Sequence, residues 1–226
     1  TQPVFTWQVN NQEINSFDLL ETEDRLASAD DNGEIVILDY NTGEVIRTLN
    51  KHTNICSSVK FRPNKPWQIL SGGLDCRLIV SDWKGSGLGV MIFEMEELAE
   101  LDYQVGFSLN PPMVHALACS SSGGMIACGL ENSTIEIFNG ATKNLSHVES
   151  LYGHTKGVSS LLCLGDELLI SGGNEGSLFL WHLTPDGSGY QFTHGEQINS
   201  LEGTDPTNIF LSDYTKNIHL VDLSHS

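Results

Sequence analysis

Four side chains in the second half of the chain have the types that nucleophilic catalysis uses. His154, Ser171 and Glu175 supply an imidazole, a hydroxyl and an acid, and Trp181 follows them. In a Ser-His-acid site, the His takes the proton of the Ser hydroxyl and the acid orients the imidazole. No GxSxG turn, which would place such a Ser beside an oxyanion hole, accompanies these residues. Two interpretations therefore stand, a nucleophilic site or a buried chain of structural hydrogen bonds.

These residues belong to a segment that recurs about every forty residues. Each copy reads as four short strands separated by turn residues such as Asn174-Glu175-Gly176, and many strands are apolar on both faces. A unit this short cannot bury its own hydrophobic face, so its neighbours must cover it. Aligning the copies on a small residue of the second strand gives Ser28, Ser71, Cys128, Ser171 and Leu211.

The repeat predicts an all-β fold, a β-propeller of four-stranded antiparallel blades. We expect a single domain over residues 1–226, with copies at about 1–40, 41–84, 85–140, 141–183 and 184–223. Residues 85–109 form an insertion, which we expect to be a short helix or an outer strand followed by an acidic loop. The strand-like stretch Val4–Val9 could complete the sheet of the last copy and close a five-bladed ring. We favour the alternative, five blades of a seven-bladed propeller.

Short pairs at the ends of the copies point to a family. Lys51-His52-Thr53 and Gly153-His154-Thr155 open two copies, and Asp82-Trp83 and Trp181-His182 stand near the ends of two. The chain resembles the WD-repeat family (Trp-Asp repeats). The resemblance implies that His154, Ser171, Glu175 and Trp181 form the structural tetrad of a blade. It implies the same role for His52, Ser71 and Asp75 in the second copy, where Ser81 replaces the Trp.

The other copies keep less of this tetrad. The first has Asn10, Ser28 and Asn32, the third has Asn110, Cys128 and Asn132, and the fifth keeps His194. Because the cluster recurs in several copies whereas catalysis needs one site, we interpret it as structural and expect no catalytic residues. A propeller glycoside hydrolase is the enzymatic alternative. Its paired carboxylates would face the central channel, where we find only Asp18 in the first copy.

The loops before the first strand and between the second and third strands form the face through which propellers generally bind partners. The residues that we expect to contact a partner there are Asp30, Asp31, Asp75, Glu131, Lys156, Glu175, Asp213 and Tyr214. An Arg or Lys side chain entering this face would meet carboxylates. Asp and Asn are also the residues that turns require, so an ordinary solvated surface is the alternative.

The leading functional hypothesis is a non-catalytic protein–protein interaction scaffold. The family resemblance implies a more specific role, substrate receptor of a cullin-RING ubiquitin ligase, which docks to its adaptor through Trp-Asp-x-Arg. This chain departs from that motif, because the Arg position holds Asn41, Lys84, Thr184 and Ser224. The alternative is a reader of basic, Lys/Arg-rich peptides through an acidic propeller face.

Composition narrows the partners further. Of the 226 residues, 11 are Lys or Arg and 29 are Asp or Glu, which gives a net charge of −18. Such a surface repels nucleic acids and anionic membranes.

The five Cys show no CxxC or Cys/His spacing, so we expect no zinc, other metal or cofactor. Reduced thiols fit a cytoplasmic or nuclear protein. The chain opens on Thr1 rather than Met, and we expect it to be part of a longer protein.

Overall fold

The computed structural model describes residues 5–85, 90–101, 110–142, 144–184 and 189–223, and the regular secondary structure of these residues consists almost entirely of β-strands. The strands form five antiparallel sheets, four of four strands and one of three. Short strands joined by tight turns are the outcome expected from the alternation of apolar runs with Asn-, Asp- and Gly-containing turns. The predicted all-β class is therefore confirmed.

Each sheet is one blade, and its strands follow one another in chain order. Blade 1 contains β1 (Ile14–Leu20), β2 (Arg25–Asp30), β3 (Glu34–Asp39) and β4 (Val45–Asn50). Blade 2 contains β5 (Cys56–Arg62), β6 (Lys65–Gly73), β7 (Arg77–Asp82) and β8 (Val90–Glu94). Blade 3 contains β9 (Val114–Cys119), β10 (Met125–Leu130), β11 (Thr134–Asn139) and β12 (Ser146–Tyr152). Blade 4 contains β13 (Val158–Leu164), β14 (Leu168–Gly173), β15 (Ser177–His182) and β16 (Gly189–Thr193), and blade 5 contains β17 (Ile198–Gly203), β18 (Ile209–Asp213) and β19 (Ile218–Val221).

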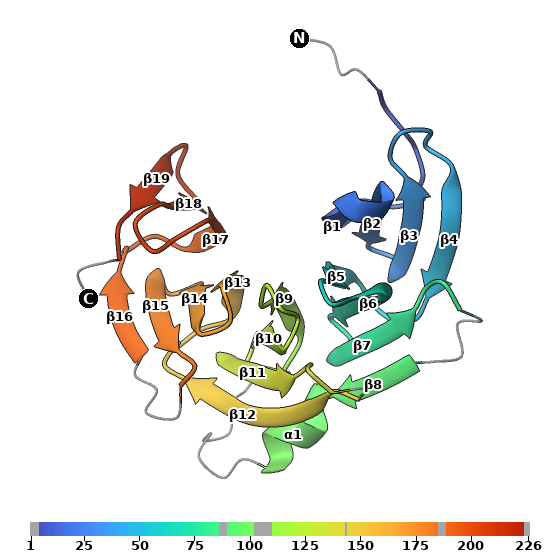
Figure 1. The fold of residues 1–226 in the computed structure, drawn as a ribbon. Helices are drawn as coiled ribbons and strands as arrows, with labels where there is room; N and C mark the ends of the chain where they lie inside the picture. Colours follow the sequence, from blue (N-terminus) through green and yellow to red (C-terminus); the bar gives the residue numbers. More distant parts are fainter. Residues whose placement is uncertain (1–4, 86–89, 102–109, 143, 185–188, 224–226) are drawn as a thin grey trace.

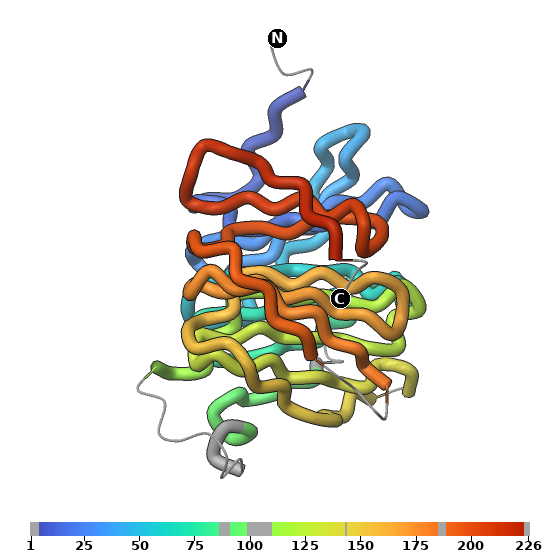
Figure 2. Tube along the Cα trace, turned by 90° about the vertical axis from the view of Figure 1, so that its left-hand side faces the viewer, coloured from blue at the N-terminus to red at the C-terminus, as the bar shows by residue number. Residues whose placement is uncertain are grey.

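The five blades are arranged radially, as in a β-propeller, with the first strand of each blade innermost (Figure 1). The innermost strands contact one another in order, β1 with β5, β5 with β9, β9 with β13 and β13 with β17. Figure 1 shows blades 1 and 5 facing each other across a gap between β1 and β17. In the side view of Figure 2, the red strands of blade 5 and the blue strands of blade 1 both lie in the upper part, and the green and yellow strands of the middle blades lie below them.

The blades are offset by one strand from the sequence copies. Each four-stranded sheet takes its outermost strand from the start of the next copy, so β4 completes blade 1 and β12 completes blade 3. The strand expected at Val4–Val9 is not formed over residues 5–9, which are irregular, and residue 4 lies outside the described residues. The insertion at 85–109 supplies β8, the outer strand of blade 2, and then α1 (Met95–Leu101). Both proposed elements, a strand and a helix, therefore occur there in succession.

The hydrophobic core lies between the blades, as the two-sided apolar strands predict. Ala27 and Ile35 of blade 1 pack with Val59 and Ile69 of blade 2. Similar buried clusters lie between blades 2 and 3, 3 and 4, and 4 and 5. Each interior blade is therefore covered on both faces by its neighbours, which is the burial pattern that a propeller requires.

One described helix and one short 3-10 turn interrupt the strands. The helix α1 lies at the periphery, outside blades 2 and 3 (Figures 1 and 2), and the 3-10 turn Glu21–Glu23 follows β1. Neither is a candidate membrane span, since the described helices are too short and polar to cross a bilayer.

Candidate functional site: polar chains of the blades and the central cavity

The cluster that resembles a Ser-His-acid site is a closed chain of hydrogen bonds in blade 4. His154, from the segment before β13, contacts the Glu175 carboxylate through Nδ1, and its Nε2 lies 2.7 Å from Ser171 Oγ on β14. Trp181 Nε1 on β15 donates to the same Ser171 Oγ at 2.8 Å. Since the carboxylate can only accept, Nδ1 carries the proton and Nε2 accepts from the Ser hydroxyl. The side-chain N–H and O–H donors of His154, Ser171 and Trp181 are then all used.

This geometry leaves Ser171 no route to a substrate. Its side chain is fully buried, and Oγ is occupied by His154 on one side and Trp181 on the other. Trp181 also stacks on Phe179, whose ring packs edge-on against His154. A nucleophile must approach a carbonyl carbon, whereas this hydroxyl is enclosed by aromatic rings. The arrangement ties the loop before β13 to the two central strands of the blade.

Blade 2 repeats the first half of this chain. His52 Nδ1 lies 2.8 Å from Asp75 Oδ1, and His52 Nε2 lies 2.9 Å from Ser71 Oγ. Asp75 also accepts from the Thr53 backbone N–H at 2.9 Å. Gly73 makes this approach feasible, because a Cβ there would lie 2.5 Å from His52 Nδ1.

The Trp of blade 4 has no counterpart in blade 2. Ser81 stands at its position, is buried, and has no hydrogen-bond partner for its hydroxyl among the described residues. The chain of blade 2 therefore ends at Ser71.

In blades 1 and 5 the acid is a residue that we did not assign to the tetrad from the sequence. In blade 1 Asn10 donates to Asp30 at 3.2 Å and accepts from Ser28, whereas Asn32 contributes only its backbone N–H to Asp30. In blade 5 His194 Nε2 lies 2.7 Å from Asp213 Oδ2. Asp30 and Asp213 occupy the strand position that is Gly73 in blade 2, as their pairing with the first strand of each blade shows. The acid therefore reaches the loop residue directly from the strand.

Blade 3 has a buried polar chain that the sequence did not reveal. Glu136 is buried in the middle of β11 and accepts from His147 Nε2 at 2.7 Å and from Ser150 Oγ at 2.6 Å, both on β12. Asn132, which we aligned with the acid of the tetrad, instead caps its own turn by accepting from Thr134 Oγ1 at 2.8 Å. Glu136 lies among the apolar residues of a strand, and only the pairing of β11 with β12 brings its partners to it.

The pKa values of three of these acids, Glu175, Asp75 and Asp213, lie below their ordinary range. Burial alone raises the pKa of Glu175, but hydrogen bonds from His154 and from the Lys156 backbone outweigh it and lower the pKa. Burial alone likewise raises the pKa of Asp75, but hydrogen bonds from His52 and from the Thr53 backbone outweigh this effect and lower the pKa. Hydrogen bonds from Thr215 and His194 hold the pKa of Asp213 well below its usual range. These carboxylates are therefore charged at neutral pH and committed to internal partners.

Half of the residues proposed to contact a partner are consequently unavailable to one. The side chains of Asp30, Asp75, Glu175 and Asp213 are largely buried and bind residues of their own blades. The others remain accessible on the same face, namely Asp31, Lys156 and Tyr214, which are exposed, and Glu131, which is half-buried and lies 2.9 Å from His115. The acidic ring on this face is thus much smaller than the sequence indicated.

A central cavity of about 670 Å³ is lined by the innermost strands of all five blades. Its charged lining residues are largely paired: Lys60 Nζ lies 2.9 Å from Asp18 Oδ1, and the buried Arg62 donates to Gly140 O at 2.5 Å. Glu21 and Glu202 also line the cavity and are exposed, and neither has an ion-pair partner within the described part of the chain. They stand where β1 and β17 end, so they mark one mouth of the cavity.

The side chains of this cavity offer little catalytic chemistry. Asp18 also accepts from the Phe61 backbone N–H at 2.8 Å, so it links blade 1 to blade 2. Cys119 and Cys163 line the cavity, and burial raises the pKa of each thiol to about 12, which keeps both protonated. Ser57 and Ser159 donate to backbone carbonyls of the next blade. The polar groups here mainly join neighbouring blades.

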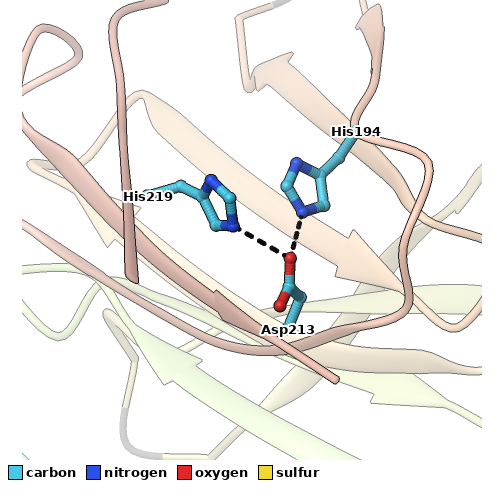
Figure 3. A group of neighbouring side chains, drawn as sticks. All are labelled: His194, Asp213 and His219. Atoms are coloured by element: carbon cyan, nitrogen blue, oxygen red, sulfur yellow. Dashed lines mark hydrogen bonds and ion pairs between the residues drawn. The ribbon is translucent and has the colours of Figure 1, made fainter. Parts of the chain in front are cut away.

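The polar group of blade 5 includes one more residue, His219 on β19. His219 Nε2 lies 3.0 Å from Asp213 Oδ2, the oxygen that His194 also contacts, so two imidazoles converge on one carboxylate oxygen (Figure 3). Their rings are 4.8 Å apart and nearly perpendicular. His219 was not among the residues selected from the sequence, since no spacing relates it to the other two.

Comparison with known proteins agrees with this architecture. The family model described as "WD domain, G-beta repeat" matches residues 43–82 and 145–182. The chain is 27% identical over 143 residues to "WD repeat-containing protein 53 homolog" of Dictyostelium discoideum, which covers 58% of this chain and 39% of the relative. It is 27% identical over 168 residues to "Protein SUPPRESSOR OF PHYA-105 1" of Arabidopsis thaliana, covering 72% of this chain and 14% of that protein.

A third relative is "Restriction of telomere capping protein 1" of Clavispora lusitaniae, 28% identical over 131 residues, which covers 57% of this chain and 10% of the relative. The matched region thus spans less than half the length of each of these relatives. WD repeats and relatives of this kind support a protein-interaction scaffold. The radial antiparallel blades, the His-Ser-acid chains and the two matched repeats together support the assignment of this chain to the WD-repeat family.

Proposed function

We propose that this chain is a non-catalytic protein–protein interaction scaffold whose central cavity receives a basic segment of its partner. The observation that carries the proposal is the pair of exposed carboxylates, Glu21 and Glu202, at one mouth of the cavity. The bases beside them are already engaged, Lys60 by Asp18 and Arg62 by Gly140 and Gln68. A Lys or Arg side chain entering there would find acceptors without competing cations.

Overall charge supports the same partner chemistry. A net charge of −18 attracts a basic segment from a distance and speeds its encounter with the cavity. Attraction between solvent-exposed charges is screened at physiological salt. Binding that depends on Glu21 and Glu202 must therefore weaken steeply as salt rises.

Titration of a labelled Lys/Arg-rich peptide, followed by fluorescence anisotropy at low and high salt, tests this proposal. The double variant Glu21→Gln, Glu202→Gln should weaken binding about fivefold or more, at about 0.5–1 kcal/mol for each exposed carboxylate. The matched control is Glu44→Gln, Glu149→Gln, which removes equal charge from exposed outer positions. Absence of binding at low salt, or equal losses in the two double variants, would refute a basic partner in this cavity.

Substrate reception for a cullin-RING ubiquitin ligase is the more specific role that we propose from the family resemblance. The segment nearest to a docking motif is Asp82-Trp83-Lys84 at the end of β7. Trp83 is buried and donates to Pro66 O at 2.8 Å, and Lys84 Nζ lies 2.5 Å from Glu23 of blade 1. Affinity capture from cells with the longer protein should recover a ligase adaptor, and Lys84→Glu should reduce its recovery. If affinity capture recovers no ligase adaptor, the proposed role as a substrate receptor is wrong.

We further propose that the complete propeller has seven blades and works in the cytoplasm or nucleus. Supporting the first point, Phe210, Ile218 and Leu220 form an exposed apolar face on blade 5, whereas interior blades bury both faces. Supporting the second, all five Cys are free thiols. An image of the longer protein that shows a closed five-bladed ring would contradict the blade number, and secretion of that protein would contradict the compartment.

A further inference from the structure

We propose that His194, Asp213 and His219 form a binding site for a divalent transition metal ion, with Zn²⁺ as the best-suited ion. Two imidazole nitrogens and one carboxylate oxygen all lie within 4.8 Å of one another (Figure 3). This donor set is one that zinc uses in proteins, with three protein ligands and a fourth position open to water. The site lies outside the central cavity and does not depend on the proposed partner.

Comparison with blade 4 shows that the cluster is more than another structural tie. In blade 4 the strand position paired with Ser171 is Phe179, whose ring packs 4.6 Å from His154. In blade 5 the position paired with Leu211 is His219, whose ring packs 4.8 Å from His194. His219 therefore occupies the place of Phe179 and keeps its aromatic contact. It also adds a nitrogen ligand that packing does not require.

The carboxylate is held in an orientation that suits a ligand. Asp213 Oδ1 accepts from the Thr215 backbone N–H at 2.7 Å and from Thr215 Oγ1 at 2.5 Å. These bonds leave Oδ2 directed at the two imidazoles. Hydrogen bonds of this kind to a ligating carboxylate orient it and raise metal affinity. His194 is fixed as well, because its backbone N–H donates to Gly176 O of blade 4 at 2.9 Å.

The spacing allows an ion to enter with small side-chain movements. Tetrahedral zinc with bonds of about 2.0–2.1 Å separates its ligand atoms by about 3.3 Å. Here the His–Asp separations are 2.7 and 3.0 Å and must lengthen slightly, whereas the two imidazole nitrogens must approach each other. The His219 side chain is 36% exposed, so the ion has a path from solvent. An ion bound there would link blade 5 to the segment that leaves blade 4.

Isothermal titration of the EDTA-treated, dialysed chain with ZnCl₂ tests the site, with bound metal counted by elemental analysis. We expect one tight site per chain, and a rise in Tm of about 5 °C or more at zinc roughly 100-fold above Kd. His219→Phe copies blade 4 and should fold with its metal-free Tm little changed. It should weaken zinc binding at least about tenfold, and Thr215→Val should weaken it about 10–100-fold through loss of carboxylate orientation.

Two controls separate this site from other metal ligands in the chain. His182→Phe removes an imidazole outside the cluster and should leave zinc affinity unchanged. Co²⁺ used as a spectroscopic probe should show ligand-field bands without thiolate charge-transfer absorption, because none of the three ligands is a Cys. Absence of saturable binding, equal affinity in His219→Phe and the parent, or a thiolate band would each overturn the proposal.

Discussion

Blades 3 and 4 are neighbours with the same strand order, yet they hold their centres together with different polar groups. In blade 4 the chain runs from loop residue His154 through Ser171 to Trp181. In blade 3 the equivalent positions carry Cys128 and Phe138, and the buried acid Glu136 instead binds the outer strand β12. The difference shows that a blade does not need one fixed set of residues. It needs each buried polar group to have a partner.

The two arrangements stabilise different parts of their blades. The blade 4 chain fixes the loop before the innermost strand, near the face where partners are expected to bind. The blade 3 pair joins the two outer strands, and His147 is partly exposed to water. Loss of a partner should therefore cost more in blade 4, where the remaining groups stay buried, than in blade 3, where water can replace it.

Trp181→Ala should produce the largest loss of stability. Removing the buried indole deletes its stacking on Phe179 and the hydrogen bond to Ser171, which together cost about 3–5 kcal/mol of unfolding free energy. Trp181→Phe, which copies Phe138 of blade 3, should recover most of this loss. Denaturant unfolding measures both variants, and an equal loss in the two would show that the indole N–H dominates over packing.

His154→Ala should follow, with a loss of about 2–3 kcal/mol, since it leaves both Ser171 and the Glu175 carboxylate without their imidazole partner. Asn132→Ala in blade 3 is the matched comparison and should cost only about 0.5–1 kcal/mol, because Asn132 caps a turn. Thermal melts can rank the two variants. A reversed order would mean that the blade 4 chain does not stabilise the fold.

Glu136→Ala should destabilise blade 3 by about 1–2 kcal/mol, less than His154→Ala destabilises blade 4. It frees His147 and Ser150, both of which can reach water from the outer strand. Hydrogen exchange should show faster opening of β12 than of β9, because β12 loses its tie. Uniform exchange throughout blade 3 would argue against a local role for Glu136.

A smaller effect should depend on pH. The pKa of Glu175 is lowered in the folded state, so the stability it contributes is present at neutral pH and is lost as pH falls below its ordinary value of 4.5 toward the folded value. Glu175→Gln should therefore flatten the fall in Tm over this acid range, whereas the exposed control Glu149→Gln should not. Parallel curves for Glu175→Gln and the parent would contradict a role for its charge.

Much of the fold could be predicted from the sequence, because repeats with two-sided apolar strands have few other ways to become buried. The hydrogen-bonded His, Ser and acid of blades 2 and 4 could be selected from the sequence for the same reason: the acid follows Ser by four residues in both, and His precedes Ser by 19 or 17. Glu136 and His219 were not, since each meets its partners only through cross-strand pairing, which a linear pattern does not record. From the sequence we interpreted Asp30 and Asp213 as exposed acids of turns. Each is the last residue of a strand and is followed by a turn, and the sequence does not show whether such an Asp is buried or solvated.

The central claim is that the His-Ser-acid-Trp chain is a structural tie of a scaffold and not a catalytic site. A double-mutant cycle of His154→Ala and Trp181→Phe tests it most directly, because both side chains bind the Ser171 hydroxyl and the Phe variant keeps an aromatic ring beside Phe179. We predict a coupling of about 0.5 kcal/mol or more in unfolding free energy, with no hydrolase activity in the parent chain. Additive losses, or ester hydrolysis by the parent that disappears in His154→Ala, would contradict this interpretation.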